Sequence, residues 1–159
     1  MRNIHTSAQE AINALTAIFE KHKDQRICVL GTTCCGKTTL LRQIPGSVDL
    51  DDELWPQLTE AEAAFISRKP WTPEIGDYID RLVYEKITVK PGHPLFTTII
   101  VDCDAVVYLD ISDELLAEHC KNRGVSFADA KNVKSAVEGD WNEHRSKGGK
   151  TFYYLVLTD

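Results

Sequence analysis

The chain has 159 residues, of which 43% are hydrophobic and 26% are charged, and its formal net charge is −6. This composition excludes a disordered or collagen-like chain and predicts one compact domain, which at this length buries roughly 70% of its unfolded surface. The acidic balance does not favour DNA as a partner. A local group of cations can offset it if they share one face: Lys121, Arg123, Lys131, Lys134, Arg145, Lys147 and Lys150.

The five cysteines include no C-x-x-C pair. This pattern matches neither a disulfide framework nor the spacing of zinc ligands, so it indicates a reducing, cytoplasmic location. No apolar run is long enough to span a membrane. We expect a soluble monomer or homodimer.

The first part of the chain predicts two helices and two strands. Ser7 and Glu10 form a capping box ahead of apolar residues at helical spacing. The apolar run in 26–30 is typical of a strand buried on both faces, and 37–43 reads as a helix that Pro45 stops. A second short strand follows at 47–51 and ends in carboxylates.

The middle of the chain predicts helices that are punctuated by prolines. Residues 54–67 are polar and compatible with a helix, and Pro73 begins an amphipathic helix that runs to about Tyr84. The third strand has two interpretations. We prefer a strand at 86–90 and a short helix at 94–101. If 97–101 were a strand, the residues between Val101 and the next predicted strand would be too few to join two parallel strands. The alternative keeps 97–102 as the strand.

The last part alternates regularly between strands and helices. We predict a strand at 105–111, a helix from the cap Ser112 to Arg123-Gly124, a helix at 127–145 and a strand at 151–157. Alternation of this kind indicates the α/β class, here a three-layer sandwich around a parallel five-stranded sheet.

A phosphate-binding loop is the most specific pattern in the chain. Gly31-x-x-x-x-Gly36-Lys37-Thr38 follows a predicted strand and opens a predicted helix. In such a loop, backbone N–H groups wrap the phosphates, the lysine reaches the β- and γ-phosphates, and the threonine ligates Mg²⁺. The sequence therefore predicts ATP and Mg²⁺ as cofactors. The nucleotide-binding residues would be Gly31, Thr32, Thr33, Cys34, Cys35, Gly36, Lys37, Thr38 and Thr39.

Two carboxylates close to the second predicted strand are candidate catalytic groups. Asp49 and Asp51 lie at its carboxyl end, the edge where ligands bind in parallel sheets and where the loop also lies. We expect Asp49, with Thr38, to hold Mg²⁺ and Asp51 to accept a proton from an attacking hydroxyl. The competing interpretation is an acidic turn that caps the next helix.

Two arginines near helix ends are candidates for stabilising the transferred phosphoryl group. Arg123 ends one predicted helix, and Arg145 lies near the end of the next. In a segment that closes over the nucleotide, such cations stabilise negative charge that develops in the transition state. We therefore predict both as catalytic, next to Lys37.

The loop, Asp49-Leu50-Asp51 and the stretch from Asp104 to Gly124 together resemble the small P-loop kinases, the superfamily of shikimate kinase, thymidylate kinase and adenylate kinase. The resemblance implies a P-loop NTPase fold of the nucleoside monophosphate kinase type. It implies a single kinase domain over 1–159, with a substrate-binding insert at about 52–85 and a lid at about 112–147. In that superfamily, aspartates after the second strand serve Mg²⁺ and the substrate hydroxyl, and the lid carries an arginine. These roles fall on Asp49, Asp51 and Arg123.

The chain departs from this superfamily at two places. Between Asp51 and Asp104 it has only Arg68 and Arg81, fewer arginines than kinases with a phosphate acceptor usually carry there. That favours a hydroxyl acceptor. A Walker B aspartate on the third strand would be Asp102, and only under the alternative reading of that strand.

The function that these expectations describe is an ATP-dependent kinase acting on a hydroxyl of a nucleoside-like or sugar-like acceptor. One alternative is a kinase that phosphorylates a hydroxymethyl pyrimidine, such as 5-hydroxymethyluracil, in phage DNA. Another is a nucleotide-dependent switch or ATPase that has no acceptor.

Overall fold

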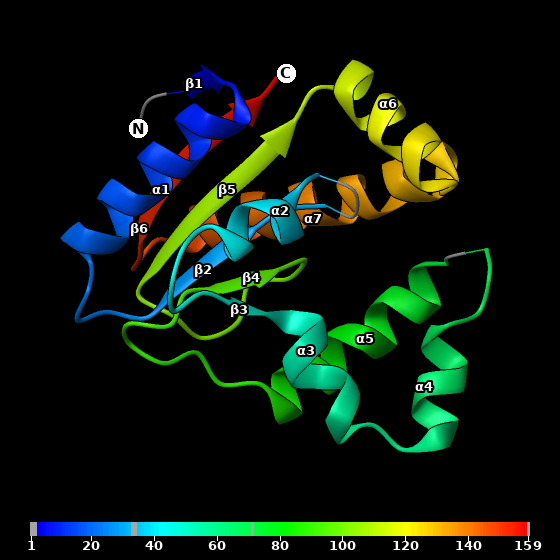
Figure 1. The fold of residues 1–159 in the computed structure, drawn as a ribbon. Helices are drawn as coiled ribbons and strands as arrows, with labels where there is room; N and C mark the ends of the chain where they lie inside the picture. The colour runs from blue at the N-terminus through cyan, green and yellow to red at the C-terminus, as the bar shows by residue number, and fades with distance from the viewer. Residues whose placement is uncertain (1–2, 33–34, 71, 159) are drawn as a thin grey trace.

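The computed structural model describes residues 3–32, 35–70 and 72–158, and within them six strands form one parallel sheet (Figure 1). The strands are β1 (Asn3–Thr6), β2 (Ile27–Leu30), β3 (Val48–Asp49), β4 (Leu95–Thr97), β5 (Ala105–Ile111) and β6 (Thr151–Leu157). Their order across the sheet is β1-β6-β5-β2-β4-β3, and each neighbouring pair is parallel. The predicted parallel sheet is confirmed, and β1 adds a strand that the sequence did not predict.

The helices connect these strands and cover the sheet. They are α1 (Ala8–Lys21), α2 (Lys37–Arg42), α3 (Leu50–Leu54), α4 (Glu60–Ile66), α5 (Pro73–Lys86), α6 (Asp113–Arg123) and α7 (Phe127–Lys147), with a 3₁₀ turn η1 (Trp55–Gln57) after α3. Hydroxyl side chains cap the N-termini of α1 and α6 in the way the sequence predicted: Ser7 accepts from the Glu10 amide, and Ser112 from the Leu115 amide. Gly124 ends α6 with a left-handed φ of 67°.

Two separate cores lie on the two faces of the sheet. The first contains buried side chains of α1, α2 and α6, and the second contains those of α3, α5 and α7. Strand β5 serves both, because successive side chains of a strand point to opposite faces: Val107 and Leu109 enter the first core, and Val106 and Tyr108 the second. The three layers and the apolar composition of the central strands follow from this double coverage.

The third strand was predicted wrongly. Residues 87–89 are not a strand, and the predicted helix at 94–101 is instead β4, Leu95–Thr97, which pairs with β2 on one side and β3 on the other. The alternative at 97–102 also fails, because β4 ends at Thr97.

The physical reason for this error lies in the connection from β4 to β5. Residues 98–104 run without a helix from the carboxyl end of β4 back to the start of β5, and seven extended residues can span about 23 Å. The strands are short enough for this reach. Ile99, Ile100 and Val101 are buried along the way, and the Ile100 amide donates to Asp140 Oδ2 on α7 at 2.7 Å. The apolar run is therefore a buried crossing, not a strand.

Candidate functional site

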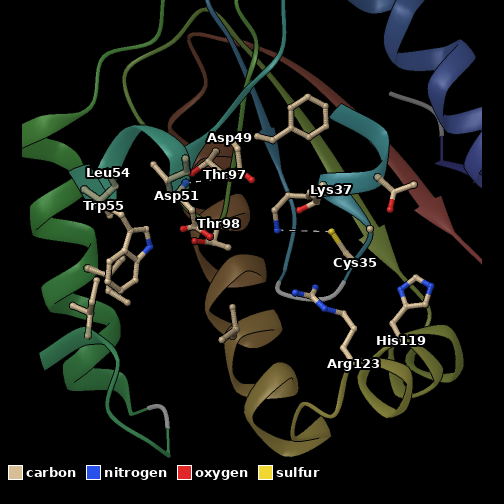
Figure 2. Close-up of a pocket in the computed structure, with 18 of the residues that line it drawn as sticks. Cys35, Lys37, Asp49, Asp51, Leu54, Trp55, Thr97, Thr98, His119 and Arg123 are labelled. Atoms are coloured by element: carbon tan, nitrogen blue, oxygen red, sulfur yellow. Dashed lines mark hydrogen bonds between the residues drawn. The ribbon is translucent and has the colours of Figure 1, made fainter. Parts of the chain in front are cut away.

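A cavity of about 590 Å³ opens at the carboxyl ends of β2, β3 and β4. Its walls come from the loop after β2, from α2, α3 and α5, and from α6 and α7 (Figure 2). The connections that follow the strands converge at this edge, as they do in other open parallel sheets. Segments separated by up to a hundred residues in the sequence therefore line one space.

The loop after β2 is folded against itself through Lys37. The ammonium Nζ donates to the carbonyl oxygens of Gly31 and Thr32, both at 2.7 Å. Its third neighbour is the Cys35 Sγ at 3.9 Å, a weak acceptor (Figure 2). An ammonium has three donors and all three contact atoms of the loop, so an anion in the cavity would have to replace the weak contact with Cys35 Sγ.

Gly31 cannot carry a side chain in this geometry. A Cβ there would lie 2.8 Å from Cys35 Sγ and 3.2 Å from the carbonyl oxygen of Leu109. The Gly31 amide donates to the Thr97 carbonyl at 3.0 Å, which ties the start of the loop to the end of β4. At the other end, Gly36 adopts a left-handed φ of 96° and begins α2. Both glycines of the motif are thus required by the backbone.

The other predicted nucleotide-binding residues divide into three groups. Thr38 and Thr39 line the cavity, as do Cys35, Gly36 and Lys37. Thr32 is buried instead, and its hydroxyl donates to the Ala130 carbonyl of α7 at 3.3 Å. The predictions for Thr33 and Cys34 lie outside the described residues.

Asp49 and Asp51 both line the cavity. The sequence predicted one strand that contains both residues, but the observed strand is shorter. Strand β3 stops at Asp49, and Asp51 lies in the first turn of α3. Asp49 is the N-cap of that helix: its Oδ1 accepts from the Asp51 amide at 3.1 Å. The capping interpretation is therefore correct for Asp49, and its carboxylate still faces the cavity (Figure 2).

The pKa of Asp51 is raised above its ordinary value. Its partial burial on the cavity wall is the main cause, and the neighbouring charge of Asp49 adds to the effect, whereas Lys37 opposes it. A carboxylate with a raised pKa is a better proton acceptor than an ordinary surface aspartate. Among the described residues of the cavity wall, Asp51 is the group whose environment suits that task.

Strand β4 brings threonines, not an aspartate, to the cavity. Thr97 is buried and its Oγ1 accepts from the Ile99 amide at 3.0 Å, and the next residue, Thr98, also lines the cavity. Asp102 lies at the opposite end of the sheet, where it pairs with Arg26 at 2.7 Å just before β5 begins. It therefore does not serve as a Walker B residue in this structure.

The two predicted arginines have different positions. Arg123, at the end of α6, lines the cavity, and Figure 2 shows it extending toward Lys37. Arg145 does not line the cavity, and its guanidinium lies 5.6 Å from the centre of the Trp141 ring. Along α7, Arg145 is twelve residues, or about 18 Å, from the cavity residue Val133. The prediction of Arg145 as a catalytic residue is not supported, because α7 runs away from the site.

Several residues of the cavity wall were missed by the sequence reasoning. His119 and Asn122 of α6 contribute beside Arg123, and a spacing of four places His119 and Arg123 on one face of the helix. That spacing was the available signal. Thr98 was missed because its segment was assigned to a helix. The apolar wall of Leu54, Trp55, Ile66, Ile79 and Val133 comes from α3, η1, α4, α5 and α7, whose packing the sequence does not reveal.

The donor set fits a magnesium ion that arrives with a nucleotide. No group of three or more His, Cys, Asp and Glu side chains among the described residues has the geometry of a metal site. Mg²⁺ in phosphoryl-transfer sites needs fewer ligands from protein, because phosphates and waters complete its octahedron. The Thr38 hydroxyl and the Asp49 carboxylate, the predicted pair, both line the cavity.

The cations that were grouped as a candidate nucleic-acid patch are held individually. Lys131 and Lys134 both pair with Asp113, at 3.0 and 2.9 Å, and Lys147 pairs with Glu143 at 3.1 Å. Lys150 donates to the Cys103 carbonyl at 2.7 Å. These contacts place their charges beside carboxylates or backbone, which weakens the case for a shared basic surface.

No protein-family model matches the chain, and no curated protein matches it significantly. Within the described residues, none of the helices combines the length and the apolar character that crossing a membrane requires.

Proposed function

We propose that the chain is a Mg²⁺-dependent ATP phosphotransferase that transfers the γ-phosphoryl group to a hydroxyl of a small, nucleoside-like or sugar-like acceptor. The observation that carries the proposal is the meeting of Lys37, Asp51 and Arg123 on one cavity, although they come from three segments of the chain. Each has the chemical character that phosphoryl transfer needs.

The loop would hold the phosphates. Lys37 is already oriented by two carbonyl oxygens, so a phosphate oxygen would need to displace only its weak contact with Cys35 Sγ. Thr38 and Asp49 would hold the Mg²⁺ ion, which neutralises phosphate charge when bound. Arg123 would stabilise the negative charge on the transferred group.

Asp51 would accept the proton of the acceptor hydroxyl. It lies across the cavity from Arg123, on the same side as Thr98 and the apolar wall (Figure 2). An acceptor placed against that wall presents its hydroxyl between Asp51 and the loop. The raised pKa of Asp51 supports this role.

The fold is compatible with this function. A central parallel strand, β2, leads into a glycine-rich loop and then into α2, and helices cover both faces of the sheet. This arrangement agrees with the P-loop NTPase fold of the nucleoside monophosphate kinase type that the resemblance implies.

The positions of the two arginines in the insert favour a hydroxyl acceptor over a phosphate acceptor. The guanidinium of Arg68 lies 5.0 Å from the centre of the Phe65 ring, and that of Arg81 lies 5.7 Å from the centre of the Tyr78 ring. Neither is among the described residues that line the cavity. In the part of the cavity where the acceptor would bind, an anionic acceptor would therefore meet carboxylates and not cations.

The test is transfer of labelled γ-phosphate from ATP, with Mg²⁺, to a panel of free nucleosides, sugars, polyols and DNA containing 5-hydroxymethyluracil. Lys37→Ala and Asp51→Asn are each expected to lower transfer by at least about 10², whereas Asp52→Asn is the matched control. Asp52 is exposed, belongs to the same helix and does not line the cavity.

The outcomes separate the alternatives. The proposal is supported if a small acceptor gains the label with the wild-type protein and does not gain it with Lys37→Ala or Asp51→Asn. That acceptor is then the substrate. Label in DNA alone supports the modified-base kinase. Equal hydrolysis of ATP with and without every acceptor supports the nucleotide-dependent switch and contradicts a kinase.

A further inference from the structure

A second cavity, of about 480 Å³, lies between α5 and α7. Its polar lining consists of Asp77 and Asp80 from α5, Asn132 and Ser135 from α7, and Thr98. None of these residues was singled out by the phosphate-binding pattern. The cavity is large enough for a group of several heavy atoms, so it requires an explanation of its own.

The two cavities are neighbours with a common wall. Ile79, Thr98 and Val133 line both. Thr98 follows the end of β4 and lies on the same side of the first cavity as Asp51 (Figure 2). The two cavities therefore adjoin at Thr98, and a molecule that occupied both would pass this residue.

Charge changes along this path. Lys37 and Arg123 are at the phosphate end of the first cavity, and Asp51 lies toward the shared wall. Among the described residues that line the second cavity, the charged ones are Asp77 and Asp80. The path therefore runs from cations that suit phosphate to carboxylates that repel anions and attract cations.

The surroundings of Asp80 lack a compensating positive charge. Burial, together with the charges of Asp140 and Asp77, raises the pKa of Asp80 to about 6. Asp140 is itself held by the Ile100 amide, at 2.7 Å, and faces His144 at 3.5 Å. A cation in the second cavity would stabilise the ionised carboxylate of Asp80.

We propose that the second cavity is the far half of the acceptor site and binds a protonated amine, so that the acceptor carries both a hydroxyl and an ammonium group. This inference rests on the proposed function, whose substrate class it narrows to amino alcohols and amino sugars. The ammonium would pair with Asp77 and Asp80, and Asn132 and Ser135 would accept further hydrogen bonds.

The test is calorimetric titration of the full chain at pH 8, without nucleotide, using linear amino alcohols of two to six carbons and the diols of equal length. The amino alcohol of best length is expected to bind at least about tenfold more tightly than its diol. Asp77→Asn and Asp80→Asn, tested separately because they are nearly isosteric changes, are each expected to reduce that preference several-fold. Glu85→Gln is the control, since Glu85 is an exposed residue of α5 that lines neither cavity.

Equal binding of amino alcohols and diols would overturn the inference. So would a preference that survives in both aspartate variants, or one that Glu85→Gln removes equally, because that result indicates attraction to the net charge of −6 and not to the cavity. Thermal unfolding of each variant verifies that it is folded.

This titration, combined with the assay of phosphate transfer to the same amino alcohols and diols, separates this inference from the proposed function. If the amine preference depends on Asp77 and Asp80 but no acceptor receives phosphate, the amine site stands and the kinase fails. If diols and amino alcohols are phosphorylated equally well, the kinase stands and the amine site fails.

Discussion

The side chain of Lys37 donates a 2.7 Å hydrogen bond to the carbonyl oxygen of Gly31, the first residue of its own loop. This contact closes the loop, and a second bond to the Thr32 carbonyl fixes the ammonium further. Gly31 is held from the other side by the end of β4, through its amide. The position of the cation that would meet phosphate therefore depends on the absence of a side chain at Gly31.

Replacing Gly31 with alanine is expected to disturb this loop. The new Cβ would lie 2.8 Å from Cys35 Sγ and 3.2 Å from the Leu109 carbonyl oxygen, so the loop must shift. We expect a loss of about 1–3 kcal/mol in the free energy of unfolding and at least a tenfold weaker affinity for ATP. Denaturant titration and nucleotide titration measure the two effects.

Gly139→Ala is the matched control for that change. Gly139 lies within α7, and a Cβ there would have nothing within 4 Å. Because glycine is a poor helix former, this variant should gain about 0.5–1 kcal/mol and bind nucleotide normally. Equal behaviour of the two variants would show that the close approach at Gly31 is unimportant.

Asp51→Asn is expected to lower the rate of phosphoryl transfer by about 10²–10⁴ without weakening ATP binding, because it removes the proton acceptor only. In the wild-type protein the carboxylate is the active form, and its pKa is raised. The rate should therefore fall as pH decreases through that raised pKa. Steady-state kinetics across pH measure this limb of the profile. An unchanged acidic limb in Asp51→Asn would refute the assignment. Asp52→Asn should keep the acidic limb but shift it to lower pH, because the charge of Asp52 contributes to the raised pKa of Asp51.

Arg123 and Arg145 offer a comparison of two arginines at helix ends. Arg123→Ala should reduce kcat by about 10³ or more, because this cation lines the cavity. Arg145→Ala should leave kcat unchanged and cost only about 0.5–1 kcal/mol in stability, from loss of its contact with the Trp141 ring. A large loss of activity in Arg145→Ala would require α7 to be placed differently relative to the site.

Asp80→Asn is expected to stabilise the protein at neutral and alkaline pH. A carboxyl group with a folded-state pKa of about 6 binds its proton more tightly in the folded than in the unfolded state. Its ionisation therefore lowers stability as pH rises from about 4 to 6, and the loss persists above that range. The variant should unfold at a higher temperature than wild type at pH 8 and at a similar temperature at pH 4.

The control for that measurement is a carboxylate of α5 that does not act on Asp80. Asp77 on the same helix and Asp140 on α7 both raise its pKa. Glu85→Gln removes a charge from an exposed position of α5 and should give no pH-dependent difference in unfolding temperature. If the difference in unfolding temperature between Asp80→Asn and wild type is the same at pH 4 and pH 8, the carboxylate of Asp80 is not buried without a compensating charge.

Lys134 joins α7 to the end of β5 and the start of α6. Its ammonium is buried and donates to the Ile111 carbonyl at 2.8 Å and to Asp113 Oδ1 at 2.9 Å. Lys134→Met should cost about 2–4 kcal/mol, because the buried Ile111 carbonyl loses its donor and the largely buried Asp110 carboxylate, 3.8 Å away, loses its cation. Lys131→Met removes a more exposed partner of the same Asp113 and should cost less than about 1 kcal/mol. Denaturant unfolding distinguishes them, and equal losses would be the contrary result.

Local patterns were sufficient wherever neighbouring residues decide the structure. The strands at Ala105–Ile111 and Thr151–Leu157 have the predicted bounds, since each is a long apolar run ended by a cap or a turn. The helix from Ser112 to Gly124 is confirmed for the same reason. Part of the predicted phosphate-binding loop belongs to this class too, because Lys37 donates to the carbonyl oxygen of Gly31, six residues earlier.

The tertiary structure alone decided the third strand and the neighbours of the site. Strand β4 has three residues, too few to show a period, and it is stabilised by pairing with β2 and β3 on its two sides. Arg123 lies at the site because α6 ends at the cavity, and Arg145 lies away from it because α7 runs away from the cavity. No spacing in the sequence encodes these directions.

The amino-acid sequence by itself thus determined the helix caps and the contact between Lys37 and Gly31, because these depend on residues close in the chain. It also predicted the parallel α/β class, because strands and helices alternate along it. The second cavity could come only from tertiary packing. Asp80 and Asn132 are far apart in the sequence and meet because α5 and α7 cover the same face of the sheet. The burial that raises the pKa of Asp80 arises from that packing, so a property of one carboxylate was decided by elements distant from it.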